Sequence, residues 1–180
     1  MSSGHDFNYR VALAAGLRCL ESGRLRHAEE QFRYLVAAFP HDEDGYRGLA
    51  RVQARSHEQA AALGTLRDGA AALARSGRRT GAIALLRDAV LLAPRDLPAH
   101  RRLGAALALA GDIDAAIVEY RRFIREVAAA GDTERATLEA RYAAEILPES
   151  RDLFSLHEAA GGTADTGARR EELDRLSRTV

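Results

Sequence analysis

The side chains best suited to metal chemistry in this 180-residue chain are its six histidines. Two imidazoles on one helix must stand about three to five residues apart to share a zinc ion. The histidines occupy positions 5, 27, 41, 57, 100 and 157, and no two of them have that spacing. The acidic segment "HDEDG" at 41–45 lacks the alternating ligands of a calcium loop, and its Asp42 and Asp44 are expected to accept hydrogen bonds from free amides at the next helix start. We therefore predict no metal and no cofactor.

Catalytic patterns are also missing from the sequence. Cys19 lies in an apolar helical stretch, where a small packing residue is expected and not a nucleophile. The glycine-rich segment "GGTADTG" at 161–167 has no lysine after it, so it does not match a phosphate-binding loop. There is no Gly-x-Ser-x-Gly segment. The sequence therefore predicts a protein that is not an enzyme.

Charge and composition narrow the partners and the location. The formal net charge is zero, with 26 basic and 26 acidic residues, so nothing favours binding to nucleic acid or to an anionic membrane. No apolar run approaches the roughly 18 residues that span a bilayer. The start "MSSGHDFNYR" has no apolar signal segment, and a lone cysteine suits a reducing compartment. We expect a cytoplasmic, bacterial-type protein.

Two rows of side chains remain as candidates for recognition. Arg47, Arg51 and Arg55 follow one another at i, i+4 and i+8, which places them on one face of a helix. A row of leucines at i, i+4 and i+7 consists of Leu13, Leu17 and Leu20. Guanidinium groups donate paired hydrogen bonds to carboxylates, and a leucine row favours apolar contacts.

Internal repeats must position these rows. A shift of 34 in the numbering places Gly77 on Gly111, and a shift of 54 places Gly23 on Gly77 and Pro40 on Pro94. Because 54 is 34 plus 20, a shortened unit must lie between the copies. The glycines are expected to end a helix and reverse the chain, since glycine adopts a left-handed backbone at little cost. Pro40 and Pro94 follow the second helix of a pair and are expected to stop that helix.

Residue size also recurs within each unit. Small residues are expected where two helix backbones approach closely, and large residues where the space between neighbouring pairs must be filled. The small set is Gly16, Ala28, Ala70, Ala82, Gly104 and Ala116. The large set is Phe32, Leu86 and Tyr120.

This pattern resembles the tetratricopeptide repeat, a pair of antiparallel helices in about 34 residues. The resemblance implies an all-α, right-handed α-solenoid of four to five units, one of them truncated. We expect an N-terminal extension over 1–8, a repeat domain over 9–160 that is irregular around 56–76 and ends in a capping helix at 150–160, and a flexible tail over 161–180. Gly64 and Gly69 fall inside the irregular segment, where either the helix bends or a close contact requires a small side chain.

In this family the first helix of each pair lines a concave groove, and its fifth position points into that groove. The positions that correspond in this sequence are Leu13, Arg47, Arg67, Arg101 and Arg135. Arg51 and Arg55 extend the row in the second unit. The row is either a solvated face or a basic groove for an acidic segment. The asparagines of the family's carboxylate clamp are missing.

The resemblance implies an adaptor or scaffold that binds a peptide or protein partner in a concave groove, and an acidic partner would suit a basic groove. One alternative is a self-assembling scaffold, in which the leucine row is covered by another copy. Residues 1–8 or a partner helix could also cover that row. A second alternative is a non-catalytic regulatory subunit of an enzyme complex.

Overall fold

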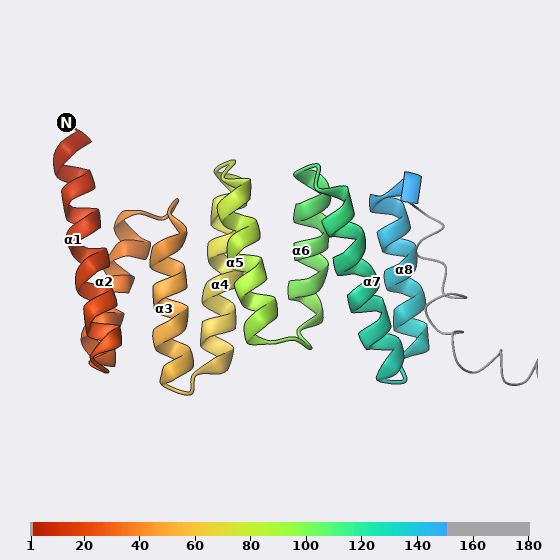
Figure 1. Cartoon of the computed structure of the whole chain (residues 1–180), viewed down its shortest axis with the longest axis horizontal. Coiled ribbons are helices and arrows are strands. Elements are labelled where there is room, and N and C mark those ends of the chain that lie inside the picture. Colours follow the sequence, from red (N-terminus) through yellow and green to blue (C-terminus); the bar gives the residue numbers. More distant parts are fainter. Residues whose placement is uncertain (1, 151–180) are drawn as a thin grey trace, which may run out of the picture. The chain divides into compact units, whose positions relative to one another are not determined.

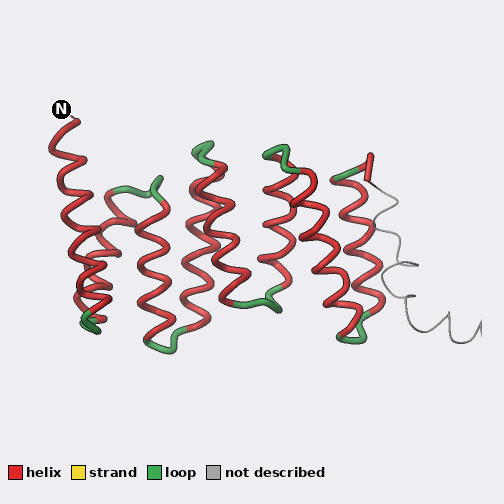
Figure 2. Tube along the Cα trace, in the orientation of Figure 1, coloured by secondary structure: helices red, strands yellow, loops and turns green. Residues whose placement is uncertain are grey.

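Eight α-helices joined by short turns form the described part of the chain, which contains no strand (Figure 1, Figure 2). A computed structural model describes residues 2–150, with side chains from residue 7 onward. The helices are α1 (Ser2–Glu21), α2 (Leu25–Ala38), α3 (Glu43–Arg55), α4 (Gln59–Arg75), α5 (Arg79–Leu92), α6 (Leu97–Leu109), α7 (Ile113–Ala129) and α8 (Thr133–Ile146). The chain divides into two compact units between Ala106 and Leu107, within α6. The all-α prediction is confirmed.

The two ends of the repeat array differ in what the structure describes. α1 begins at Ser2, so it takes in residues that we expected to form an N-terminal extension. Tyr9 holds this part of the helix in place, because its ring packs edge-on against Phe39 at 5.0 Å and its hydroxyl donates to Asp44 Oδ2 at 2.8 Å. At the other end α8 stops just before Pro148, which cannot continue a helix. The expected capping helix and tail lie outside the described residues beyond Ser150.

Five turns in the described residues share one backbone pattern. In each, the residue after the turn donates its N–H to the carbonyl five residues earlier. Four of these turns carry a glycine with φ between 73° and 88°, namely Gly23, Gly77, Gly111 and Gly131. This confirms the predicted role of the turn glycines. The fifth turn carries His57, which has a φ of 64° and which the sequence did not identify as a turn residue.

The helix lengths repeat with a period of three helices. α2, α5 and α8 each contain 14 residues, α3 and α6 contain 13, and α4 and α7 contain 17. The first residues of α2, α5 and α8 are Leu25, Arg79 and Thr133, which are related by the shift of 54 already seen in the sequence. The other two sets are related by the same shift. It is therefore the period of the whole described chain.

This period explains the segment around 56–76 that we expected to be irregular. α4 stands between two turns of the same kind, those at His57 and Gly77. It is therefore the second helix of a pair with α3 and the first helix of a pair with α5. α7 stands between Gly111 and Gly131 in the same way. The repeat that appeared truncated in the sequence is thus explained by α4, a helix shared by two pairs. α7 is a second helix of this kind.

Small residues allow close helix contacts, as predicted. Phe32 is fully buried, and a Cβ added at Gly16 would lie 2.9 Å from its ring. A Cβ at Gly48 would overlap the same ring. Phe32 therefore fills the space between α1 and α3. The other two large residues of the predicted set, Leu86 on α5 and Tyr120 on α7, are also buried.

Gly64 and Gly69 lie inside α4, where the sequence predicted either a bend or a close contact that requires a small side chain. A Cβ at Gly69 would lie 2.5 Å from Tyr46 Cγ and 2.9 Å from Leu85 Cδ1, whereas a Cβ at Gly64 would meet nothing within 4 Å. Gly69 is thus required by a close contact, and Gly64 is not. The Tyr46 hydroxyl also donates to the Pro40 carbonyl at 3.1 Å, which fixes the ring above the end of α2.

A similar contact between an aromatic ring and a proline carbonyl occurs 54 residues later. His100 is the counterpart of Tyr46 on α6, and its Nε2 lies 2.8 Å from the carbonyl of Pro94. Each of these polar rings therefore satisfies a carbonyl at the proline turn that ends the preceding helix.

The predicted capping role of the acidic segment is wrong. Asp42 occupies the N-cap of α3, but its side chain accepts no capping hydrogen bond and lies 3.6 Å from Arg78 Nη1. Asp44 accepts the Tyr9 hydroxyl. Both carboxylates therefore interact with side chains from other parts of the chain, Asp42 with Arg78 before α5 and Asp44 with Tyr9 on α1. Within residues 2–150, no helix is both long enough and apolar enough to cross a bilayer.

Candidate functional site

The arginine row of α3 separates into three environments. Arg47 Nε donates to Asp88 Oδ2 on α5 at 2.6 Å. Arg55 Nη1 donates to the carbonyl of Leu20 at 2.6 Å, and so satisfies the end of α1. Arg51, between them, is exposed and makes no hydrogen bond or ion pair with any described residue.

The remaining arginines of the expected row belong to three other helices, α4, α6 and α8. Arg67 Nη1 is 3.6 Å from Asp96 Oδ1, in the loop before α6. Arg101 is exposed on α6, and Arg135 is exposed on α8 in the second unit. The structure therefore brings Arg47 and Arg51 together, whereas Arg67 pairs with a different element. The shared helix α4 accounts for this, because it shifts the alternation of first and second helices by one.

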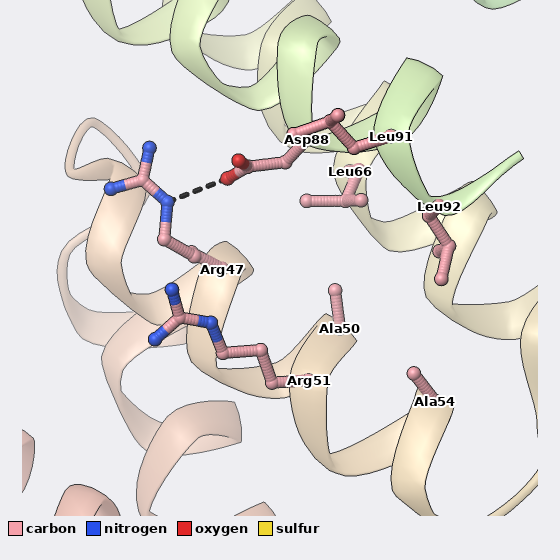
Figure 3. Close-up of a pocket in the computed structure, with 8 residues that line it drawn as sticks. All are labelled: Arg47, Ala50, Arg51, Ala54, Leu66, Asp88, Leu91 and Leu92. Atoms are coloured by element: carbon pink, nitrogen blue, oxygen red, sulfur yellow. Dashed lines mark hydrogen bonds and ion pairs between the residues drawn. The ribbon is translucent and has the colours of Figure 1, made fainter. Parts of the chain in front are cut away.

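An open pocket of about 270 Å³ lies between α3 and α5 (Figure 3). These two helices contact each other directly, and both also contact α4. The pocket is lined by Arg47, Ala50, Arg51, Ala54, Leu66, Asp88, Leu91 and Leu92. Leu66 comes from α4, is 3% exposed and forms the floor. Leu91 forms part of the wall and is 77% exposed.

The pocket combines an apolar lining with an arginine edge. In Figure 3, Arg47 and Arg51 lie on one side, with Ala50, Ala54 and the three leucines on the other. Burial alone would lower the pKa of the Arg47 guanidinium, but the hydrogen bond and the charge of Asp88 outweigh it and leave that pKa raised. Arg47 is therefore a firmly charged group that already holds a carboxylate. The arrangement can bind an organic group with apolar and anionic parts.

Sequence reasoning did not identify the α5 side of this pocket. Asp88 and Leu91 belong to no recurring pattern, and Asp88 meets Arg47 across 41 residues of chain. One signal was present in the run Val90, Leu91 and Leu92. Because successive helix residues point about 100° apart, three apolar residues in a row cannot all face the core.

The leucine row is mostly internal. Leu20 is 8% exposed and belongs to the core of the first helices, and Leu13 packs against that core. Leu17 is 37% exposed. Leu20 therefore faces its own chain, and of the three expected contact residues only Leu17 presents much of its surface.

Within the described residues, no group of three or more His, Cys, Asp or Glu side chains could hold a metal ion. Cys19 is half-buried and packs against the first core, as expected of a packing residue.

The repeat geometry of the described helices defines the fold class. Paired antiparallel helices, recurring turns with a left-handed residue, and contacts of small with large residues at matching positions give the described residues a tetratricopeptide-like helical-repeat fold. No family model matches the chain, and no curated protein sequence matches it.

Solved structures of similar fold cover most of the chain. MamA is 18% identical, over 86% of this chain and 96% of its own, with a TM-score of 0.39. YrrB, a TPR protein with an unusual peptide-binding site, is 16% identical over 82% of this chain and 89% of its own, with a TM-score of 0.32. TTC0263, a thermophilic TPR protein in Thermus thermophilus, is 21% identical over 84% of this chain and 98% of its own, with a TM-score of 0.31. The class assignment rests on the repeat geometry of the chain itself.

Proposed function

We propose that this protein is a non-catalytic interaction scaffold, and that the pocket between α3 and α5 receives part of a peptide or protein partner. The observation that carries the proposal is the pocket itself, whose apolar lining is open to solvent next to two arginines. Leu91 is the most exposed of the three pocket leucines. It is exposed over 77% of its surface, and binding of a partner that covered it would be stabilised by the burial of apolar surface. The cytoplasmic location expected from the single cysteine is part of this proposal.

The test is a selection of peptides from a random phage-displayed library against the purified full chain. Ala54→Phe places a ring in the pocket, and Ala61→Phe places the same ring on an exposed part of α4 outside it. Selected peptides should bind the parent and Ala61→Phe alike, and should lose about tenfold or more in affinity for Ala54→Phe. Failure to select any peptide, or equal binding to all three proteins, would overturn the proposal.

Self-assembly is a second candidate, and it has its own supporting observation. On the outer face of α1, Phe7 is 64% exposed and Val11 is 49% exposed, one turn apart. A second copy of the chain could cover this face. Sedimentation equilibrium should then show a mass that rises with concentration for the parent and stays monomeric for Phe7→Ser with Val11→Ser. A monomeric parent across the concentration range would exclude self-assembly.

A further inference from the structure

The charge of the α3–α5 pocket is unevenly compensated. Two arginines and one aspartate line it, which leaves a formal charge of +1. Asp88 pairs with Arg47, and Glu43 and Asp44 also act on the Arg47 charge. Arg51 is exposed and has no partner among the described residues. The uncompensated charge of the pocket is therefore located at Arg51.

The apolar part of the pocket lies next to that charge. Ala54 follows Arg51 by three residues on α3, which corresponds to about 4.5 Å along the helix axis. The small side chains of Ala50 and Ala54 leave space in the pocket, which the buried Leu66 also lines. The volume of about 270 Å³ is several times the ≈30 Å³ that one water molecule occupies in the liquid. An aliphatic side chain therefore fits beside Arg51.

We propose that this pocket recognises a partner segment in which an aliphatic side chain lies next to a side-chain carboxylate. The aliphatic group packs on Leu66 and Leu91, and the carboxylate binds Arg51. This inference rests on the proposed function and specifies its partner chemistry. A carboxylate is favoured over a phosphate because the pocket offers one free guanidinium and contains the carboxylate of Asp88, which would repel a more highly charged anion.

Asp88 also limits how strongly an acidic partner can bind. Its Oδ2 lies 2.6 Å from Arg47 Nε, so it already occupies the position that a partner's carboxylate would take. It is an internal competitor that directs the incoming carboxylate to Arg51. Removing its charge should free Arg47 and create a second binding group for the same carboxylate.

The experiment uses three small probes and two-dimensional amide NMR of the full chain. The probes are N-acetyl-Leu-Glu-amide, its uncharged match N-acetyl-Leu-Gln-amide, and N-acetyl-Ala-Glu-amide, which lacks the aliphatic group. The Leu-Glu probe should shift resonances of α3 and α5 and bind about two- to fivefold more tightly than the Leu-Gln probe, the range expected for an exposed ion pair. It should also bind more tightly than the Ala-Glu probe, which keeps the carboxylate but buries less apolar surface. Arg51→Gln should abolish the preference for Glu over Gln.

Two further variants test whether the preference for Glu depends on the charges of the pocket or on the charge of the whole protein. Arg79→Gln removes an exposed arginine outside the pocket and should leave the preference unchanged. Asp88→Asn should increase binding of the Leu-Glu probe about two- to fivefold and leave the Leu-Gln probe unchanged. The amide spectrum of each variant reports whether the fold is intact.

Three results would overturn the inference. They are no shift in α3 or α5 at about 20 mM of the Leu-Glu probe, equal binding of the Glu and Gln probes, or a Glu preference that survives Arg51→Gln. If library peptides still bind the parent and fail on Ala54→Phe, the proposed function stands and only its acidic specificity is wrong. If no library peptide binds either, both proposals fail.

Discussion

The two glycines of α4 give a sharp test of how α4 packs against α3. Alanine at either position should favour the helix by about 0.5–1 kcal/mol, because glycine loses more backbone freedom on folding. At Gly64 nothing lies within 4 Å of the added Cβ, so this gain is the whole effect. Gly64→Ala should therefore stabilise the protein by about 0.5–1 kcal/mol.

At Gly69 the same gain is opposed by overpacking. The added Cβ would lie 2.5 Å from Tyr46 Cγ and 2.9 Å from Leu85 Cδ1. The tyrosine ring cannot easily withdraw, since it is 7% exposed and its hydroxyl is bonded to the Pro40 carbonyl. Overpacking costs about 1–3 kcal/mol, so Gly69→Ala should destabilise the protein by about 1 kcal/mol after the helix gain is subtracted.

Urea unfolding followed by far-ultraviolet circular dichroism measures both changes. We expect the two alanine variants to differ by about 2 kcal/mol in free energy of unfolding, with opposite signs relative to the parent. In a Tyr46→Ala background the penalty at Gly69 should shrink, because the two nearest atoms belong to the tyrosine ring and only Leu85 Cδ1, at 2.9 Å, remains. Equal shifts for the two variants would refute the packing of Tyr46 over Gly69.

Three other outcomes follow from single contacts. His57→Gly should raise the free energy of unfolding by about 0.5–1 kcal/mol, because a side chain at a φ of 64° is strained, and a lower melting temperature would contradict this. Ala116→Leu should cost about 1–3 kcal/mol in a site with no exposed surface, whereas Ala61→Leu on the surface of α4 should change stability little. Burial first, and then the hydrogen bond to Asp44, raise the pKa of Tyr9 well above 10.0, so the folded protein keeps this phenol neutral. Its contribution to stability should be present below pH 10 and lost as the pH rises above it, and Tyr9→Phe should flatten the fall in unfolding free energy measured from pH 8 to pH 11.

The sequence predicted the parts of the fold that depend on local backbone and on size. Gly23 and Gly77 have the expected left-handed backbone, and Phe32 and Tyr120 are buried where large residues were expected. The segment around 56–76 was expected to be irregular, but its left-handed turn at His57 was not identified, because histidine gives no such backbone signal. Without that turn, a helix shared between two pairs resembled a truncated repeat.

The candidate site was predictable only on its α3 side. Spacing placed Arg47 and Arg51 on one face, but it could not show that Asp88 neutralises Arg47, since that pair depends on how α3 packs against α5. Arg55 was expected in the groove, yet a carbonyl at the end of α1 takes its guanidinium. Contacts between distant elements decide which charges remain available, and periodicity does not encode them.

The three-helix period restricts how this chain can change in length. Deleting residues 39–92, one full period, would join α2 to the proline turn before α6, and the new junction would copy the one already found between α2 and α3. Deleting only residues 39–72, the length of one helix pair, would instead join α2 to the last turn of α4, where no proline turn follows. Shorter or longer versions that keep every helix next to a suitable neighbour therefore differ by whole three-helix periods. The smallest change in length that preserves the existing neighbours is therefore three helices, which is more than one helix pair.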